Sequence, residues 1–251
     1  MQRGLVRPPW QYVADQEGGR PIQYLALAAD YDGTLVSAGR VSAEVEGALG
    51  ELRSSGRRAV VVTGRTLAEL GAACPNLELF DYAVLENGGV LYDPSTRKMT
   101  MLGPPVSLEL ARALERRGVG PVITGRVILS TRRPHEVVVE EVIRDLGLET
   151  RIIFNGNAVM VLPSGVDKGS GLEAAFREME LSGHEVVGVG NGENDHAFLE
   201  ICGCSVAVAN ADAAIKASVD FCTVGSNGTG VTELIEELIT TDLSRHAPHG
   251  S

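Results

Sequence analysis

The sequence is poor in aromatic residues and in positive charge, and each shortage excludes a class of partner. Phe, Trp and Tyr make up 4% of the 251 residues, too few for a platform that stacks single-stranded bases. The 22 Lys and Arg residues are outnumbered by 33 Asp and Glu, which gives a net charge of −11. That balance argues against binding to a nucleic-acid backbone. A small anionic substrate stays compatible, because a metal and a few cations can dominate one site.

The chain also lacks a disulfide framework and a long apolar run. None of its four cysteines forms a C-x-x-C pair, so we expect reduced thiols and a cytoplasmic protein. No apolar run approaches the ~20 residues of a membrane helix, so we expect no membrane partner. The sequence leaves the oligomeric state open between monomer and homodimer.

What is present is an alternation of strands and helices, which is typical of an α/β fold with a parallel sheet. Short apolar runs at 24–29, 59–62 and 82–85 predict buried strands. Between them, residues 41–52 have helical periodicity with Ser42 as a candidate N-cap, and a second helix is expected to begin near Thr66.

The pattern changes in the middle of the chain. Hairpin-like segments and short helices follow one another over residues 88–164, and the strand–helix alternation returns after Pro163. We therefore predict a discontinuous α/β core of residues 22–87 and 165–243, with a smaller α+β domain inserted at 88–164. Residues 1–21 are expected to be a poorly ordered extension, because they contain Pro8-Pro9, Gly18-Gly19 and mixed charges without an apolar core.

The most informative motif is Asp30-Tyr31-Asp32-Gly33-Thr34, which directly follows the first apolar run. Ligands of open α/β sheets collect at the carboxyl edge of the strands. Two carboxylates this close repel each other, so they need a cation or different protonation states. The pattern predicts a carboxylate nucleophile held near a metal, with the second carboxyl group as acid and base.

Three further polar segments fall at strand ends or helix starts of the same layer. They are Thr63-Gly64-Arg65 after the second strand, Lys168 at the start of a helix, and the loop Gly190-Asn191-Gly192-Glu193-Asn194-Asp195 after a later strand. Segments far apart in sequence but at one sheet edge can converge on one site.

Together these motifs resemble those of the haloacid dehalogenase superfamily of phosphohydrolases. Asp30–Thr34 is similar to the D-x-D-G-T motif, Thr63 to the strand-terminal Thr or Ser, Lys168 to the helix-opening lysine, and Gly190, Asn194 and Asp195 to the G-D-x-x-N-D motif. The long interval between Thr63 and Lys168 looks like a type IIB (C2B) cap insertion, as in Cof-like and sucrose-phosphate-phosphatase-like members. The resemblance implies a Rossmann-like core with an α+β cap domain.

The resemblance also implies roles for individual residues. Asp30 would attack phosphorus to form an aspartyl-phosphate, and Asp32 would act as acid and then base. Thr63, Gly64, Arg65, Lys168 and Asn194 would bind the phosphate or the rest of the substrate. A Mg²⁺ ion would be held by Asp30, the Asp32 backbone carbonyl, Asn191 and Asp195. The expected activity is Mg²⁺-dependent hydrolysis of a small phosphorylated metabolite, with a sugar phosphate favoured.

The sequence departs from the family pattern at position 191, where Asn replaces the usual Asp. An amide oxygen can coordinate Mg²⁺ but brings no charge, so we expect weaker metal binding there unless Glu193 compensates. Two alternatives stay open: a phosphomutase, because phosphomannomutases share this fold and cap type, and a weakly active phosphate-binding protein, which Asn191 makes conceivable.

Substrate choice is expected to lie in the inserted domain. Residues 121–131 alternate as one long strand, which would put Arg126 on a face with Thr124 and Ile128. We select Arg126 as the candidate for a second anionic or hydroxyl-rich group of the substrate. The pattern does not distinguish a hexose phosphate from phosphoglycolate or a disaccharide phosphate.

Overall fold

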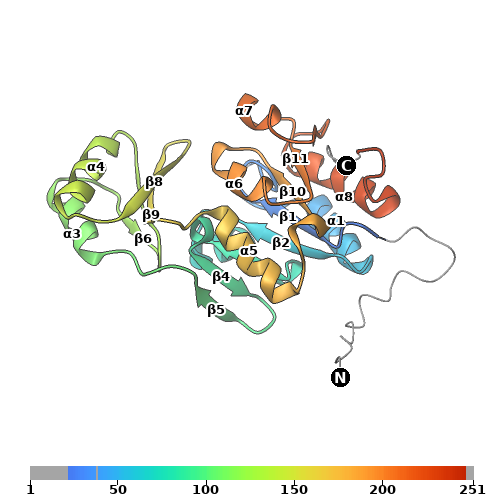
Figure 1. Ribbon diagram of the computed structural model, residues 1–251, viewed down its shortest axis with the longest axis horizontal. Coiled ribbons are helices and arrows are strands. Elements are labelled where there is room, and N and C mark those ends of the chain that lie inside the picture. The colour runs from blue at the N-terminus through green and yellow to red at the C-terminus, as the bar shows by residue number, and fades with distance from the viewer. Residues whose placement is uncertain (1–21, 38, 247–251) are drawn as a thin grey trace, which may run out of the picture.

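The computed structural model describes residues 22–37 and 39–246, which form a large and a small β-sheet (Figure 1). The predicted extension at residues 1–21 lies outside the described residues. The large sheet has the strand order β12-β11-β10-β1-β2-β3-β4-β5. Its strands are β1 (Ala26–Asp30), β2 (Arg58–Val62), β3 (Tyr82–Leu85), β4 (Val90–Asp93), β5 (Lys98–Met101), β10 (Val186–Gly190), β11 (Cys204–Ala207) and β12 (Phe221–Cys222).

Strand β1 lies inside the sheet, in parallel pairing with β10 on one side and β2 on the other. All five of its residues are buried, as expected for a strand covered on both faces. The pairs β2–β3, β10–β11 and β11–β12 are also parallel, and only β4 and β5 run antiparallel. The α/β fold with a parallel sheet is therefore confirmed.

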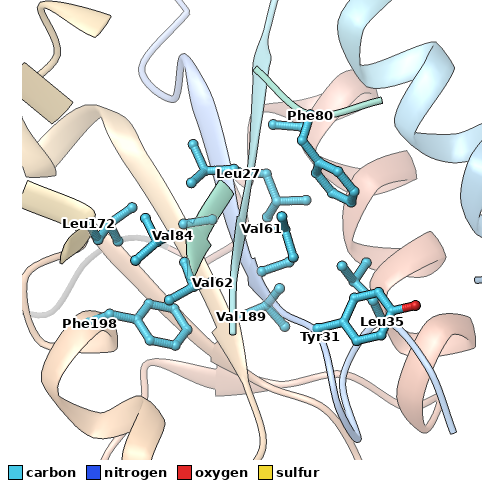
Figure 2. Close-up of a cluster of buried hydrophobic side chains, with 14 of the residues drawn as sticks. Leu27, Tyr31, Leu35, Val61, Val62, Phe80, Val84, Leu172, Val189 and Phe198 are labelled. Atoms are coloured by element: carbon cyan, nitrogen blue, oxygen red, sulfur yellow. The ribbon is translucent and has the colours of Figure 1, made fainter. Parts of the chain in front are cut away.

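Helices cover both faces of the large sheet. Helix α1 (Ala43–Ser54) packs against α8 (Asn227–Thr241), whereas α5 (Lys168–Met179) packs on β3 and on α6 (His196–Leu199). In Figure 2, Phe198, Val84 and Leu172 lie to one side of the strands, and Tyr31, Leu35 and Phe80 lie to the other. The remaining elements of this layer are α2 (Leu67–Ala73), α7 (Ala213–Lys216) and the 3-10 turns η2 (Leu77–Leu79), η3 (Glu86–Gly88), η4 (Gly183–Glu185) and η5 (Glu193–Asp195).

The helix starts predicted from the sequence are confirmed. Ser42 caps α1, where its side chain accepts the backbone N–H of Val45. Thr66 caps α2 in a capping box with Glu69. Lys168 is the first residue of α5. Among the described residues, no helix has the length and apolar character needed to cross a membrane.

The small sheet belongs to the middle of the chain and has the antiparallel order β6-β7-β9-β8. Its strands are β6 (Ile123–Thr124), β7 (Leu129–Arg132), β8 (Thr150–Asn155) and β9 (Ala158–Pro163). Helices α3 (Leu108–Arg116) and α4 (Glu136–Asp145) bury their apolar side chains with Leu129 and Val161 of this sheet. In Figure 1 this unit lies at one end of the molecule.

The hairpin at residues 90–101 forms as predicted, but in the other sheet. We expected it in the inserted segment 88–164, whereas β4 pairs with β3 and β5 pairs with β4, so both extend the large sheet. The reason is that Val90 and Leu91 are apolar and find buried places beside β3. The division of the chain into a core and a cap domain stays a prediction; this hairpin belongs structurally with the large sheet.

The single strand predicted over residues 121–131 is wrong. The segment instead forms the two short strands β6 and β7, because the chain turns between them. Gly125 donates its backbone N–H to Ile128 O, and the buried carboxylate of Glu86 accepts the N–H groups of Arg126, Val127 and Ile128 at 2.8–3.1 Å. The strand thus ends because its backbone binds Glu86, which lies 40 residues earlier in the sequence than Arg126.

Replacing Glu86 by glutamine is expected to lower the free energy of unfolding by about 1–3 kcal/mol. The glutamine keeps the size of the side chain but turns one acceptor oxygen into an NH₂ group, which would face backbone N–H donors at the β6–β7 turn. Urea unfolding at neutral pH measures the change, and Glu140→Gln on the exposed face of α4 is the matched control. Equal midpoints for Glu86→Gln and the control would contradict this role.

Candidate active site

The two aspartates of the first motif lie at the carboxyl end of β1. Asp30 is the last residue of the strand and is 4% exposed, whereas the side chain of Asp32 is 42% exposed. Gly33 lies between Asp32 and the buried Thr34, with φ of +87°, a conformation that suits glycine. The strand therefore delivers one buried and one accessible carboxylate to the same edge.

Lys168 ties the buried carboxylate to the loop after β10. Its side chain is 1% exposed, and Nζ lies 2.5 Å from Asp30 Oδ1 and 2.6 Å from Asp195 Oδ1. Burial raises the pKa of Asp30 to about 7, and the charge of Asp195 adds to this, while Lys168 opposes it. Burial also disfavours the charged ammonium, but the two carboxylates outweigh it and raise the pKa of Lys168. Lys168 is therefore cationic at neutral pH.

Asp195 holds this loop in place. Its Oδ2 accepts the backbone N–H groups of Asn191 and Gly192 at 2.8 and 2.9 Å, while its Oδ1 receives Lys168. Both oxygens of the carboxylate are thus already engaged. The role of Asp195 as a metal ligand stays a prediction; its hydrogen bonds position Lys168 and the backbone at Asn191.

The side chain of Asn191 points at the two aspartates. One terminal atom of its amide lies 2.9 Å from Thr34 Oγ1 and 3.0 Å from both Asp30 Oδ2 and the Asp32 backbone oxygen. If that atom is nitrogen, its two protons are shared among these three acceptors. If it is oxygen, Thr34 donates to it, and it faces two further acceptors with no proton between them, an arrangement that suits a cation.

With oxygen at that position, the Asn191 amide, Asp30 Oδ2 and the Asp32 backbone oxygen fit a magnesium site. An octahedral Mg²⁺ with metal–oxygen distances of about 2.1 Å separates neighbouring ligand oxygens by about 3.0 Å, which is the spacing found from Asn191 to Asp30 and Asp32. Within residues 22–37 and 39–246, no group of three or more His, Cys, Asp or Glu side chains could hold a metal. A magnesium site at this edge would therefore also need the Asn191 amide and a backbone carbonyl.

The second motif follows β2 at the neighbouring strand end. The register pairs Asp30 with Val62, so Thr63 comes one residue beyond the partner of Asp30. Thr63 is fully buried, and its Oγ1 accepts the backbone N–H of Arg65 at 3.2 Å. Gly64 lines the same cavity as Asp30 and Asp32. The expected convergence of the two strand ends is therefore present.

Arg65 forms an ion pair with Asp32, the candidate general acid. Its Nε and Nη2 donate to the two carboxylate oxygens of Asp32 at 2.8 and 2.6 Å, and its guanidinium lies 4.9 Å from the centre of the Tyr31 ring. We predicted that Arg65 binds phosphate. In this arrangement it fixes the direction of the Asp32 carboxylate, because a two-pronged contact allows little rotation.

Two other predicted substrate residues lie away from this cavity. Asn194 donates to Asn87 Oδ1 at 3.4 Å and does not line the space beside Asp30. Arg126 is exposed on the β6–β7 turn and lines a different groove, with Thr66 and Met99. The prediction for Arg126 depended on the long strand that the structure replaces by a hairpin.

The cavity beside the aspartates has a volume of about 250 Å³ and two walls. The large-sheet wall is formed by Asp30, Asp32, Gly64, Arg65 and Glu69. The other wall comes from the small sheet and the segment that leads into it: Pro121, Ile123, Ser130, Thr131, Arg132, Asn155, Asn157, Ala158 and Met160. Sequence reasoning missed this second wall, although the alternation in β7 would have found Ser130 and Arg132 once the hairpin was known.

Comparison with known proteins identifies the family of this chain. A family model described as haloacid dehalogenase-like hydrolase matches residues 27–105 and 127–235. A phosphoglycolate phosphatase of Methanothermobacter thermautotrophicus is 31% identical over 85% of this chain and 98% of its own length. One from Haloarcula marismortui is 33% identical over 83% of this chain and 95% of its own length.

Solved structures agree on the fold. A haloacid dehalogenase-like hydrolase from Bacteroides thetaiotaomicron superposes with a TM-score of 0.74 at 18% identity, covering 86% of this chain and 99% of its own. A sugar phosphatase of subclass IIB in the same superfamily has a TM-score of 0.70 at 19% identity, with 85% of this chain and 98% of its own covered. At these identities the likeness extends to the fold, with the small sheet included.

Proposed function

The chain belongs to the haloacid dehalogenase-like hydrolases, and we propose that it hydrolyses a small phosphorylated acid with Asp30 as nucleophile. The class of enzyme, a phosphoric monoester hydrolase, follows from the family and from the two phosphatase relatives. Asp30 carries the finer proposal, because it is a buried carboxylate held by Lys168 at the edge of a cavity that also contains Asp32.

The proposed reaction has two steps. Asp30 attacks phosphorus and forms an aspartyl-phosphate, while Asp32 gives a proton to the leaving alkoxide oxygen. Asp32 then takes a proton from the water that opens the acyl phosphate. Arg65 orients Asp32, and its contact leaves the Asp32 carboxylate partly exposed on the cavity side. Lys168 and the Thr63–Gly64 turn stabilise the charge on the phosphoryl oxygens.

The residues at the β1 edge fit Mg²⁺, which Asp30 Oδ2, the Asp32 backbone oxygen and the Asn191 amide oxygen would hold. When bound, the ion would offset the negative charge of the phosphoryl group. Asp195 belongs to this proposal as the residue that fixes Asn191 and Lys168. A cytoplasmic location and a monomeric or dimeric state stay predictions.

A phosphorylated acid is preferred to a sugar phosphate for two reasons. Two relatives that match over nearly their whole length, those of Methanothermobacter thermautotrophicus and Haloarcula marismortui, are named phosphoglycolate phosphatases. The cavity, at about 250 Å³, is smaller than the ~300–1,000 Å³ typical of ligand pockets. A compact substrate such as 2-phosphoglycolate suits this space better than a disaccharide phosphate.

Phosphate release across a panel of substrates tests the proposal. We expect the purified protein to release phosphate from 2-phosphoglycolate faster than from glucose 6-phosphate or sucrose 6-phosphate, and to stop when EDTA removes divalent cations. Release that prefers a sugar phosphate would overturn the substrate class. Binding of phosphate without release from any substrate would favour the binding protein that Asn191 left open, and transfer between positions on a sugar would favour a mutase.

Asn191→Asp is expected to strengthen Mg²⁺ binding by about tenfold or more, because it replaces a neutral ligand by a charged one. In metal-free protein the same change should lower the melting temperature, since a further carboxylate then faces Asp30 at close range. Isothermal titration with MgCl₂ and thermal melts in EDTA measure both effects without substrate. Asn76→Asp, on an exposed loop, is the control. Unchanged Mg²⁺ affinity would show that position 191 is not a ligand.

A further inference from the structure

The open face of the small sheet presents one cation to the substrate cavity. The register aligns Ser130 with Met160 and Arg132 with Ala158, so these four side chains share a face. Leu129 and Val161 occupy the opposite face, where they pack with α3 and α4. All four residues of the first group line the cavity beside Asp30. Arg132 therefore extends from the small sheet toward the same space as the aspartates.

Arg132 differs from three nearby arginines, Arg65, Arg133 and Arg151, in having no side-chain partner among the described residues. Arg65 is paired with Asp32, Arg133 with Glu136, and Arg151 with Asp167. The side chain of Arg132 makes no ion pair or hydrogen bond within the described ranges of the chain. It is the one cavity-lining cation there that is not already neutralised by an acid. The chain as a whole carries a net charge of −11 and repels anions. An arginine that faces the cavity without an acidic partner attracts anions locally.

Among the described residues that line the cavity, the large-sheet wall has no spare cation for a second anionic group. The charge of Lys168 is shared between Asp30 and Asp195, and that of Arg65 is taken by Asp32. Glu69, which also lines this wall, adds a negative charge. A second anionic group on the substrate would therefore be repelled by the large-sheet wall and attracted to the small-sheet wall.

Amide groups stand beside Arg132 on that wall. Ala158 of β9 pairs with Arg132 on one side and with Asn155 on the other. Arg132 and Asn155 therefore lie on the same, open face of the sheet. Asn155 and Asn157 line the cavity as well. A guanidinium offers two parallel N–H donors that match a carboxylate, and an amide NH₂ can add a third hydrogen bond.

We infer that Arg132 is the receptor for the carboxylate of the substrate, an inference that rests on the proposed phosphatase function and names the residue that selects among phosphate esters. Asn155 assists it. Arg132 contacts the end of the substrate that does not react, so it determines specificity rather than the chemical step.

The test compares 2-phosphoglycolate with 2-phosphoglycolamide, in which an amide of the same size replaces the carboxylate. Arg132→Ala is expected to lower kcat/KM for the acid by about 10- to 100-fold, mainly through a higher KM. The same variant should change kcat/KM for the amide by less than about threefold, because the amide forms no ion pair. Arg132→Lys should fall between wild type and Arg132→Ala for the acid, since lysine keeps the charge but not the two-pronged geometry.

Arg126→Ala is the matched control, because it removes the same charge from the neighbouring turn, outside this cavity. It should leave both substrates unaffected. Equal losses on acid and amide in Arg132→Ala, or no loss on either, would overturn the inference while leaving the phosphatase intact. If the wild-type protein hydrolyses neither compound yet releases phosphate from another ester, the proposed substrate class fails and the inference with it.

Discussion

Asp30→Asn is expected to reduce phosphate release by about 10⁴-fold or more, since an amide cannot act as the nucleophile. The substitution keeps the shape of a side chain that is 4% exposed and 2.5 Å from Lys168. Steady-state phosphate release with saturating MgCl₂ measures the loss. Asp145→Asn, at the exposed end of α4, removes the same charge elsewhere and should retain full activity. Activity of Asp30→Asn within tenfold of wild type would remove Asp30 from the role of nucleophile.

The loss should not come from unfolding, and the pKa of Asp30 gives the reason. Burial, with the charge of Asp195, raises that pKa to about 7 from an ordinary value of 3.8. Between these values the folded protein keeps a proton that the unfolded chain has released, so this group lowers stability as pH rises, and its full cost is present above pH 7. Asparagine carries no such cost.

Metal-free Asp30→Asn should therefore be at least as stable as wild type at pH 8, with the difference shrinking toward pH 4. Urea unfolding in EDTA at pH 4, 6 and 8 measures this trend. The opposite trend would be a variant that loses stability relative to wild type as the pH rises from 4 to 8. It would mean that the ion pair with Lys168 dominates the environment of Asp30.

Lys168→Met is expected to have the largest effect on stability, about 3–5 kcal/mol at pH 8 without metal. Removal of the ammonium leaves the carboxylates of Asp30 and Asp195 buried without their shared cation. Phosphate release should also fall by about 10²- to 10³-fold, because one charge that stabilises the phosphoryl oxygens is gone. Lys216→Met, at an exposed position of α7, is the control.

A double variant separates the ion-pair effect from a simple packing defect. Adding Asp30→Asn to Lys168→Met should restore part of the lost stability, because one of the two uncompensated charges disappears with it. Urea unfolding of the two single variants and the double variant forms the cycle. A gain from Asp30→Asn that is no larger in the Lys168→Met protein than in wild type, or a Lys168→Met protein as stable as wild type, would contradict a structural role for the ion pair.

The large-sheet half of the site was predictable because its residues depend on local patterns. An apolar run ends at Asp30, another at Val62 just before Thr63, and Lys168 follows a helix-capping Asp167. Parallel strands place their carboxyl ends at one edge whatever joins them, so the convergence of these motifs needed no knowledge of the loops.

The small-sheet half was not predictable in the same way. Residues 121–131 alternate well enough for one strand, yet Glu86 binds the backbone at Arg126–Ile128 and turns the chain. That contact joins residues 40 apart, and no local propensity encodes it. The consequence is that Arg126, our candidate, lies on a turn, and Arg132 occupies the cavity wall.

The sequence by itself thus determined the α/β class, the strand ends at Asp30 and Thr63, the helix start at Lys168, and the chemistry these groups can perform. Only the tertiary structure decided how the polar groups pair: Arg65 with Asp32, Asp195 with the amides of its own loop and, in the part of the chain that the structure describes, Arg132 with no acid. Strand ends follow from the period of apolar residues, a short-range property. Pairing depends on which side chains meet across sheets and loops, and that is set by packing between segments far apart in the chain.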